Sequence, residues 1–198
     1  YILKRGQPIS FVKSMKSFLL SLVVFVVFHG VLPAGASEWD CASTSGTFER
    51  STDCTMGDEV AVSGDLTVTG KETVYSTLTA ASGKRHFKIT SGAPRVSLKW
   101  LNLTGGDTTS NSGDDRHGGS IHVYNVAAHL NISHCVFFNN RASAGSGGAV
   151  FAQYGQPTLF FSSVLFDSNL AAVGGAVFLS RGTFHGEGNT FQENTAEF

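Results

Sequence analysis

The chain has 198 residues, of which 41% are hydrophobic and 15% charged, and its formal net charge is −1. This low charge, together with 23 glycines and 16 phenylalanines, argues against a coiled coil, a charged helical bundle, and a disordered or collagenous chain. No cluster of Lys and Arg follows residue 36, so the sequence predicts no nucleic-acid partner. A single domain with an all-β or repeat fold agrees best with this composition.

Residues 15–36 have the pattern of a cleaved secretory signal peptide. Lys16 precedes an apolar run at residues 18–28, and an A-x-A sequence at Ala34–Ala36 predicts a cleavage site. We therefore expect the mature chain to begin near Ser37 and to retain no transmembrane segment.

An uncleaved membrane anchor is the alternative interpretation of the same apolar run. His29, Gly30 and Pro33 interrupt the run before it reaches the roughly 20 apolar residues of a transmembrane helix. Residues 1–14 lie upstream of Met15, and we expect them to be an extension that is not native to the protein.

Secretion would place the cysteines in an oxidising compartment. We therefore expect a disulfide between Cys41 and Cys54, which would stabilise the start of the domain by roughly 3 kcal/mol. Two cysteines do not establish pairing from sequence alone, so two free thiols remain the alternative. Cys135 lies in an apolar run and is predicted to be a small buried hydrophobic residue, not a nucleophile.

Two short motifs repeat in the second half of the chain. The first is a Gly-Gly pair followed by a small residue and a β-branched one, at Gly118-Gly119, Gly147-Gly148 and Gly174-Gly175. The second is an alternating apolar segment that ends in Phe-x-x-Asn, with Phe137 and Asn140, Phe166 and Asn169, and Phe191 and Asn194 at its ends.

These motifs predict an all-β fold, a parallel β-helix (solenoid) of several coils. The link from the end of one motif to the next Gly-Gly pair shortens from 12 to 7 to 5 residues, and a solenoid tolerates insertions at one such corner. Alternation of period two on either side predicts strands. Equivalent residues of successive coils would then stack, the phenylalanines inside the coil and the asparagines at a turn. The Gly-Gly pairs would permit positive φ and close approach of the coils.

The GGAV and FxxN sequences resemble the repeats of the polymorphic outer-membrane protein family. This resemblance covers residues 96–198 and implies a right-handed β-helix at a bacterial cell surface or outer membrane, with a role in adhesion. Two features depart from the family pattern. Gly106 stands where the first repeat should have Asn, and the chain ends inside a repeat, so we expect a fragment that is truncated at its carboxyl end.

Residues 37–95 lack the repeat but alternate β-forming residues with Gly and Ser turns. We expect an amino-terminal cap and irregular first coils here, with Trp39 and the Cys41–Cys54 segment covering the end of the core.

A possible ligand-binding surface follows from the coil register. His122, Phe151 and Phe178 are predicted to point outward and to stack on successive coils, which would suit the rings of a glycan or an apolar protein partner. The alternative is that a neighbouring loop folds back and covers them.

The alternative function is that of a carbohydrate-active enzyme, a polysaccharide lyase or hydrolase of the pectate-lyase-like class, because such enzymes often use parallel β-helices. They need carboxylates on neighbouring coils. The predicted outward columns stack no two acids; they contain Ser97, Asn131, Phe160 and His185, then Lys99, Ser133, Ser162 and Glu187, then Thr104, Phe138, Asp167 and Gln192.

The acidic insertion at residues 107–117 is predicted to be a solvated loop, with a calcium or active site as the alternative. We expect no catalytic residue, metal or cofactor. Two sequons, at Asn102 and Asn131, would be glycosylated only in a eukaryotic secretory pathway. The sequence thus predicts a secreted or cell-surface protein for non-catalytic recognition of a glycan or a cell-surface protein, with a purely structural spacer as a further alternative.

The signal-peptide interpretation is tested by sequencing the amino terminus of the exported protein and by labelling its thiols. We expect a first residue near Ser37 and no labelling of Cys41 or Cys54 without reductant. Retention of residues 18–28 would contradict the cleavage, and labelling of both thiols would contradict the disulfide.

Overall fold

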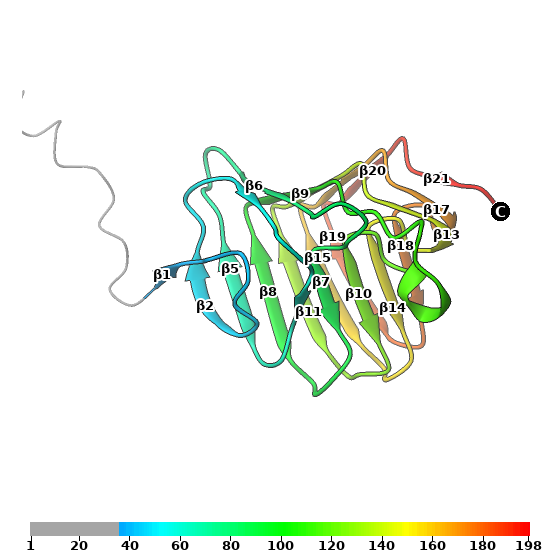
Figure 1. The fold of residues 1–198 in the computed structure, drawn as a ribbon, viewed down its shortest axis with the longest axis horizontal. Helices are drawn as coiled ribbons and strands as arrows, with labels where there is room; N and C mark the ends of the chain where they lie inside the picture. The colour runs from blue at the N-terminus through cyan, green and yellow to red at the C-terminus, as the bar shows by residue number, and fades with distance from the viewer. Residues whose placement is uncertain (1–35) are drawn as a thin grey trace, which may run out of the picture. The chain divides into compact units, whose positions relative to one another are not determined.

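A computed structural model describes residues 36–198, which form an all-β parallel solenoid (Figure 1). In Figure 1 the colour advances from blue at β1 (Ser37–Glu38) to red at β21 (Thr195–Ala196), because each coil lies against the one before it. The paired strands among residues 36–198 are all parallel and form ladders between successive coils. The parallel β-helix predicted from the repeats is confirmed. Residues 1–14 and all of the predicted signal peptide except Ala36 lie outside the described residues.

The strands form four sheets that run along the solenoid. Sheet A contains, in spatial order, β1, β2 (Gly46–Glu49), β5 (Leu66–Thr69), β8 (Arg95–Lys99), β11 (His129–Ser133), β15 (Thr158–Ser162) and β19 (Thr183–Glu187). Sheet B contains β20 (Thr190–Gln192), β16 (Leu165–Asp167), β12 (Val136–Phe138), β9 (Leu101–Thr104), β6 (Ser76–Thr79) and β3 (Cys54–Thr55). Sheet C contains β18 (Val177–Ser180), β14 (Val150–Gln153), β10 (Ile121–Tyr124), β7 (Phe87–Ile89) and β4 (Val60–Ala61). Sheet D contains β13 (Arg141–Ser146), β17 (Leu170–Val173) and β21.

One short 3₁₀ helix, η1 (Gly113–Arg116), lies in the insertion between β9 and β10. Among residues 36–198 no helix is long and apolar enough to cross a membrane.

The interior is built from equivalent residues of successive coils. Phe137 pairs in register with Phe166, and Phe166 with Phe191. Their rings stack with centroids 5.1 and 4.8 Å apart. This separation follows from the roughly 4.8 Å spacing of hydrogen-bonded strands, which brings identical side chains into face-to-face contact. Phe137 and Phe166 are fully buried, whereas Phe191 of the last coil is 52% exposed.

The asparagines form a hydrogen-bonded ladder along the same axis. The Nδ2 of Asn140 donates to Oδ1 of Asn169 at 3.1 Å, and Nδ2 of Asn169 donates to Oδ1 of Asn194 at 2.9 Å. The Oδ1 of each also accepts a backbone N–H from the preceding coil, and the first of these donors is Gly106. Gly106 therefore ends the ladder. Although the first repeat has no Asn at this position, both polar atoms of the Asn140 side chain have hydrogen-bond partners.

The Gly-Gly pairs satisfy two separate requirements. Gly147 has a φ of +68°, a conformation that L side chains rarely adopt. A Cβ on Gly148 would instead collide with the Gly175 carbonyl oxygen and the Leu170 nitrogen of the next coil. The same division applies to the pairs at 118–119 and 174–175.

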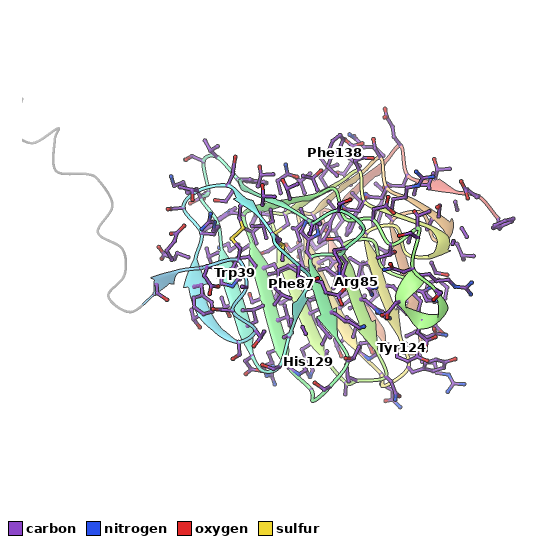
Figure 2. All side chains as sticks on the ribbon, in the orientation of Figure 1. Trp39, Arg85, Phe87, Tyr124, His129 and Phe138 are labelled. Carbon is purple, nitrogen blue, oxygen red and sulfur yellow. A yellow bond between two sulfur atoms is a disulfide. The ribbon has the colours of Figure 1, made fainter. Side chains whose placement is uncertain are left out.

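The amino-terminal coils close one end of the core. Trp39 is fully buried and its ring stacks on Phe87 at 5.8 Å; Figure 2 shows both residues. Cys41 and Cys54 are joined by a disulfide with their Cα atoms 6.6 Å apart. Trp39 and the disulfide therefore close the apolar interior at the amino-terminal end of the solenoid, where the irregular coils contain β2 to β7.

The Asn ladder should contribute measurably to stability. Replacing Asn169 with Ala removes the acceptor of the Asn140 N–H and the donor to the Phe137 carbonyl, so we expect a loss of about 1–3 kcal/mol in the free energy of unfolding. Gln153→Ala is the control, because the Gln153 amide has no hydrogen bond within residues 36–198, and it should cost less than about 0.5 kcal/mol. Equal costs in chemical denaturation would contradict the role of the ladder.

Close approach at the glycine corner can be tested separately. Gly148→Ala forces apart two coils that meet through backbone atoms, so we expect a loss of more than about 2 kcal/mol. Gly57→Ala, where a Cβ meets nothing within 4 Å, should leave the thermal midpoint nearly unchanged. A similar midpoint for both variants would show that the coils can separate freely.

Candidate functional site

The three aromatic residues predicted as a binding surface lie in one column on the outer side of sheet C. His122 pairs in register with Phe151, and Phe151 with Phe178. The ring centroids of Phe151 and Phe178 are 5.3 Å apart with an interplanar angle of 8°, and those of His122 and Phe151 are 5.2 Å apart. The column therefore has the stacking and direction that the register predicts.

The predicted exposure of this column is wrong for two of its three members. His122 and Phe151 are each only 1% exposed, because residues 107–117, here called the strap, fold back over them. His117 stacks its ring on Phe151 at 4.4 Å, and Asp115 reaches Lys88 with an O–N distance of 2.6 Å. The alternative of a covering loop is thus what the structure shows, and the acidic insertion folds onto sheet C while its residues 112–116 stay exposed to solvent. Phe178 remains partly exposed.

Charged groups surround His122 beneath the strap. Arg85 is 1% exposed and forms ion pairs with Glu59 at 3.0 Å and with Asp115 at 3.7 Å. Burial, followed by the charge of Arg85, lowers the pKa of His122 to about 3. His122 is therefore neutral in the folded protein, and neither of its ring nitrogens has a hydrogen-bond partner among residues 36–198.

The open side of the solenoid is the outer face of sheet A. Phe160 on β15 is 42% exposed, and its ring stacks on that of His185 on β19 at 4.6 Å, with only 7° between the planes. A hollow of about 480 Å³ surrounds this pair and is lined by Asn131, Phe160, Phe161, Ser162, Phe184, His185, Gly186 and Glu187.

A second hollow adjoins the first at Phe160 and Asn131, which line both. Its volume is about 460 Å³, and it is lined by Thr47, Asp65, Thr67, Arg95, Val96, Ser97, His129, Asn131 and Phe160. Figure 2 shows His129 near the edge of the solenoid. The two hollows together form the sheet A groove, a strip of small polar side chains that crosses several coils and has one open aromatic pair.

The columns of the sheet A groove are those that the repeats predict. Asn131 pairs with Ser97 and with Phe160, and Phe160 pairs with His185. The sequence reasoning misses this column, because its criterion for an outward site is stacked acids and not stacked rings. Its sequence signal is an aromatic residue followed by His at the same register position one coil later.

The carboxylates of the sheet A groove are far apart. Asp65 precedes β5 and Glu187 ends β19, which is four strand spacings or roughly 19 Å away along the axis. Asp65 also accepts a hydrogen bond from the Arg95 N–H at 2.8 Å. In the part of the chain that the structure describes, no group of three or more His, Cys, Asp or Glu side chains is arranged to hold a metal ion.

The remaining candidate residues lie apart from each other. Asn131 is exposed in the sheet A groove, whereas the Oδ1 atom of Asn102 is buried without a partner. Cys135 is 1% exposed, and burial raises the pKa of its thiol to about 12. It is thus the buried hydrophobic residue that the sequence predicts, and not an activated nucleophile.

Comparison with known proteins adds one match. The family model of the Chlamydia polymorphic membrane protein repeat matches residues 134–153, which include Phe137, Asn140 and the pair Gly147-Gly148. Neither the search of curated proteins nor that of solved structures gave a significant match. The match falls on the coil that contains the first residues of the Phe and Asn stacks, Phe137 and Asn140. One coil of this parallel β-helix, at residues 134–153, is therefore similar to the polymorphic membrane protein repeat of Chlamydia.

Proposed function

We propose that this protein is a non-catalytic recognition protein of the cell surface or outer membrane, and that its sheet A groove binds a carbohydrate. The repeat family supports the location. The observation that carries the binding role is the exposed Phe160–His185 pair, which stacks at 4.6 Å on β15 and β19 and lines a hollow at this end of sheet A. In the same proposal the β-helix is right-handed, the hand that parallel crossover connections adopt.

The chemistry of the groove suits a sugar ring. An aromatic face provides a flat apolar surface for the C–H groups of a pyranose, and burying it against the sugar contributes favourably to binding. Asn131 and Ser162 supply hydrogen-bond donors and acceptors beside the ring, and Glu187 supplies an acceptor. Because all of these side chains stand on hydrogen-bonded strands, little conformational entropy is lost when a ligand binds.

The distribution of charge favours binding over hydrolysis or lyase chemistry. Paired acid and base carboxylates lie about 5–9.5 Å apart in glycoside hydrolases, whereas Asp65 and Glu187 are separated by four strand spacings. A purely structural spacer would have no use for an open aromatic pair, since exposed rings raise the risk of aggregation.

The proposal predicts that Phe160→Ala abolishes most of the affinity for a glycan. We expect a glycan array to identify ligands of the described domain, and calorimetry to show at least about a tenfold weaker dissociation constant for Phe160→Ala, because the stacking surface is lost. Phe138→Ala is a matched control: Phe138 is 43% exposed on the outer face of sheet B, and Figure 2 shows it at the periphery.

Three results would contradict the proposal. One is the absence of any glycan ligand for the folded wild-type protein. Another is unchanged affinity in Phe160→Ala, and the third is an equal loss in Phe138→Ala, which would indicate nonspecific adhesion through exposed rings.

A further inference from the structure

Polar contacts attach the strap at its start and over sheet C. At its start the N–H groups of Asp107 and Thr108 donate to the carbonyls of Lys84 and Arg141, each at 2.9 Å. The Asp115 carboxylate meets Lys88 on β7, and its backbone carbonyl accepts a hydrogen bond from Arg85. On the other side, Nδ1 of His117 accepts the backbone N–H of Ser146 at 2.9 Å. This last bond requires an unprotonated Nδ1, so it exists only while His117 is neutral.

Beneath the strap the structure buries a histidine without hydrogen bonds. His86 offers a comparison, because it is equally buried but both its ring nitrogens have partners, Ser120 and the Leu78 carbonyl, each at 2.9 Å. His122 has no partner for either nitrogen. Leaving a buried polar group unpaired costs free energy that opening the strap to water would recover.

The charges that face His122 come from each neighbouring element. Arg85 and Lys88 approach from the β7 side, Asp115 and His117 from the strap, and the Tyr124 ring lies 5.7 Å away on β10. Glu59 faces Arg85 from the coil below. The Asp115 carboxylate favours a charged His122, but this carboxylate is already paired with Lys88. The positive charges of Arg85 and Lys88 oppose a positive charge on His122.

We propose that the strap is an acid-released cover: protonation of His122 and His117 lifts residues 107–117 from sheet C and exposes the Phe151–Phe178 aromatic column. Two effects act in the same direction. A charged imidazole at position 122 is stabilised by water once the strap opens, and a protonated His117 no longer accepts the Ser146 N–H.

The direction of the pH dependence follows from the protonation of the two states. In the closed state the pKa of His122 is about 3, whereas an opened strap would return it toward the ordinary value of roughly 6.5. The open state therefore binds more protons between these limits, and the closed state loses stability as the pH falls below about 6.5. Between pH 7 and pH 5 the ratio of open to closed strap should rise by up to about 25-fold from His122 alone. Burial, and then the charge of Arg116, also lowers the pKa of His117, which adds to the effect.

Hydrogen exchange measures this opening directly, with labelling times scaled for the intrinsic pH dependence of amide exchange. We expect amides of residues 108–118 to lose protection by roughly 10- to 25-fold between pH 7 and pH 5. Amides of β11 and β15 in sheet A should keep theirs. The double variant His117→Phe and His122→Phe preserves the ring packing and should abolish the acid response, whereas His134→Gln, at a distant corner, should retain it.

A second variant tests the cover even if the double variant fails to fold. Asp115→Asn removes the charge that pairs with Lys88, so strap amides should exchange several-fold faster at pH 7 already; Glu72→Gln, an exposed residue without an ion pair, should have no effect. The proposal is overturned by wild-type strap protection that is independent of pH, by an acid response that persists in the double variant, or by parallel loss of protection in sheet A. Unchanged strap protection in Asp115→Asn would overturn it as well.

Discussion

The fold depends on one geometric constraint, the spacing of about 4.8 Å between hydrogen-bonded parallel strands, which places every residue directly on its equivalent in the next coil. A side chain at a given position therefore packs against the side chains at the same position in the coils on either side. Flat rings meet this requirement by stacking, as Phe137 and Phe166 do, and primary amides meet it by donating to one another, as Asn140 and Asn169 do. Glycine meets it by having no side chain where the backbones of adjacent coils touch.

The same constraint separates the two outer faces that matter for function. On sheet A the column through Asn131, Phe160 and His185 is exposed, since no connection within residues 36–198 covers it, and its aromatic pair lines the hollows described above. On sheet C the column through His122, Phe151 and Phe178 is crossed by the strap and loses most of its exposure. Two columns with similar chemistry therefore have different accessibility, and the difference comes from one connection and not from the strands.

Periodic features of this structure could be read from the sequence, and aperiodic ones could not. The constant 12-residue separation between Gly118 and Leu130, and between Gly147 and Leu159, fixes the register, and strand pairing follows it residue by residue. The path of the strap depends on contacts such as Asp115 with Lys88, which are 27 residues apart and occur once. A contact that occurs once leaves no periodic pattern in the sequence. The sequence therefore predicts that His122 points outward but not that the strap covers it. The exposed Phe160–His185 pair can be predicted from the sequence, because the repeat register places these two residues at equivalent positions of successive coils.

The corner that holds the strap is also where the chain can change length without cost to the core. Links of 12, 7 and 5 residues occupy equivalent places after Gly106, Asn140 and Asn169, yet the Asn ladder and the glycine corner on either side keep their geometry. In the longest link the added residues form the strap over sheet C, whereas the two shorter links contain β13 and β17 of sheet D. Genetic variation in this single link can therefore mask or unmask an aromatic column while the scaffold is inherited unchanged.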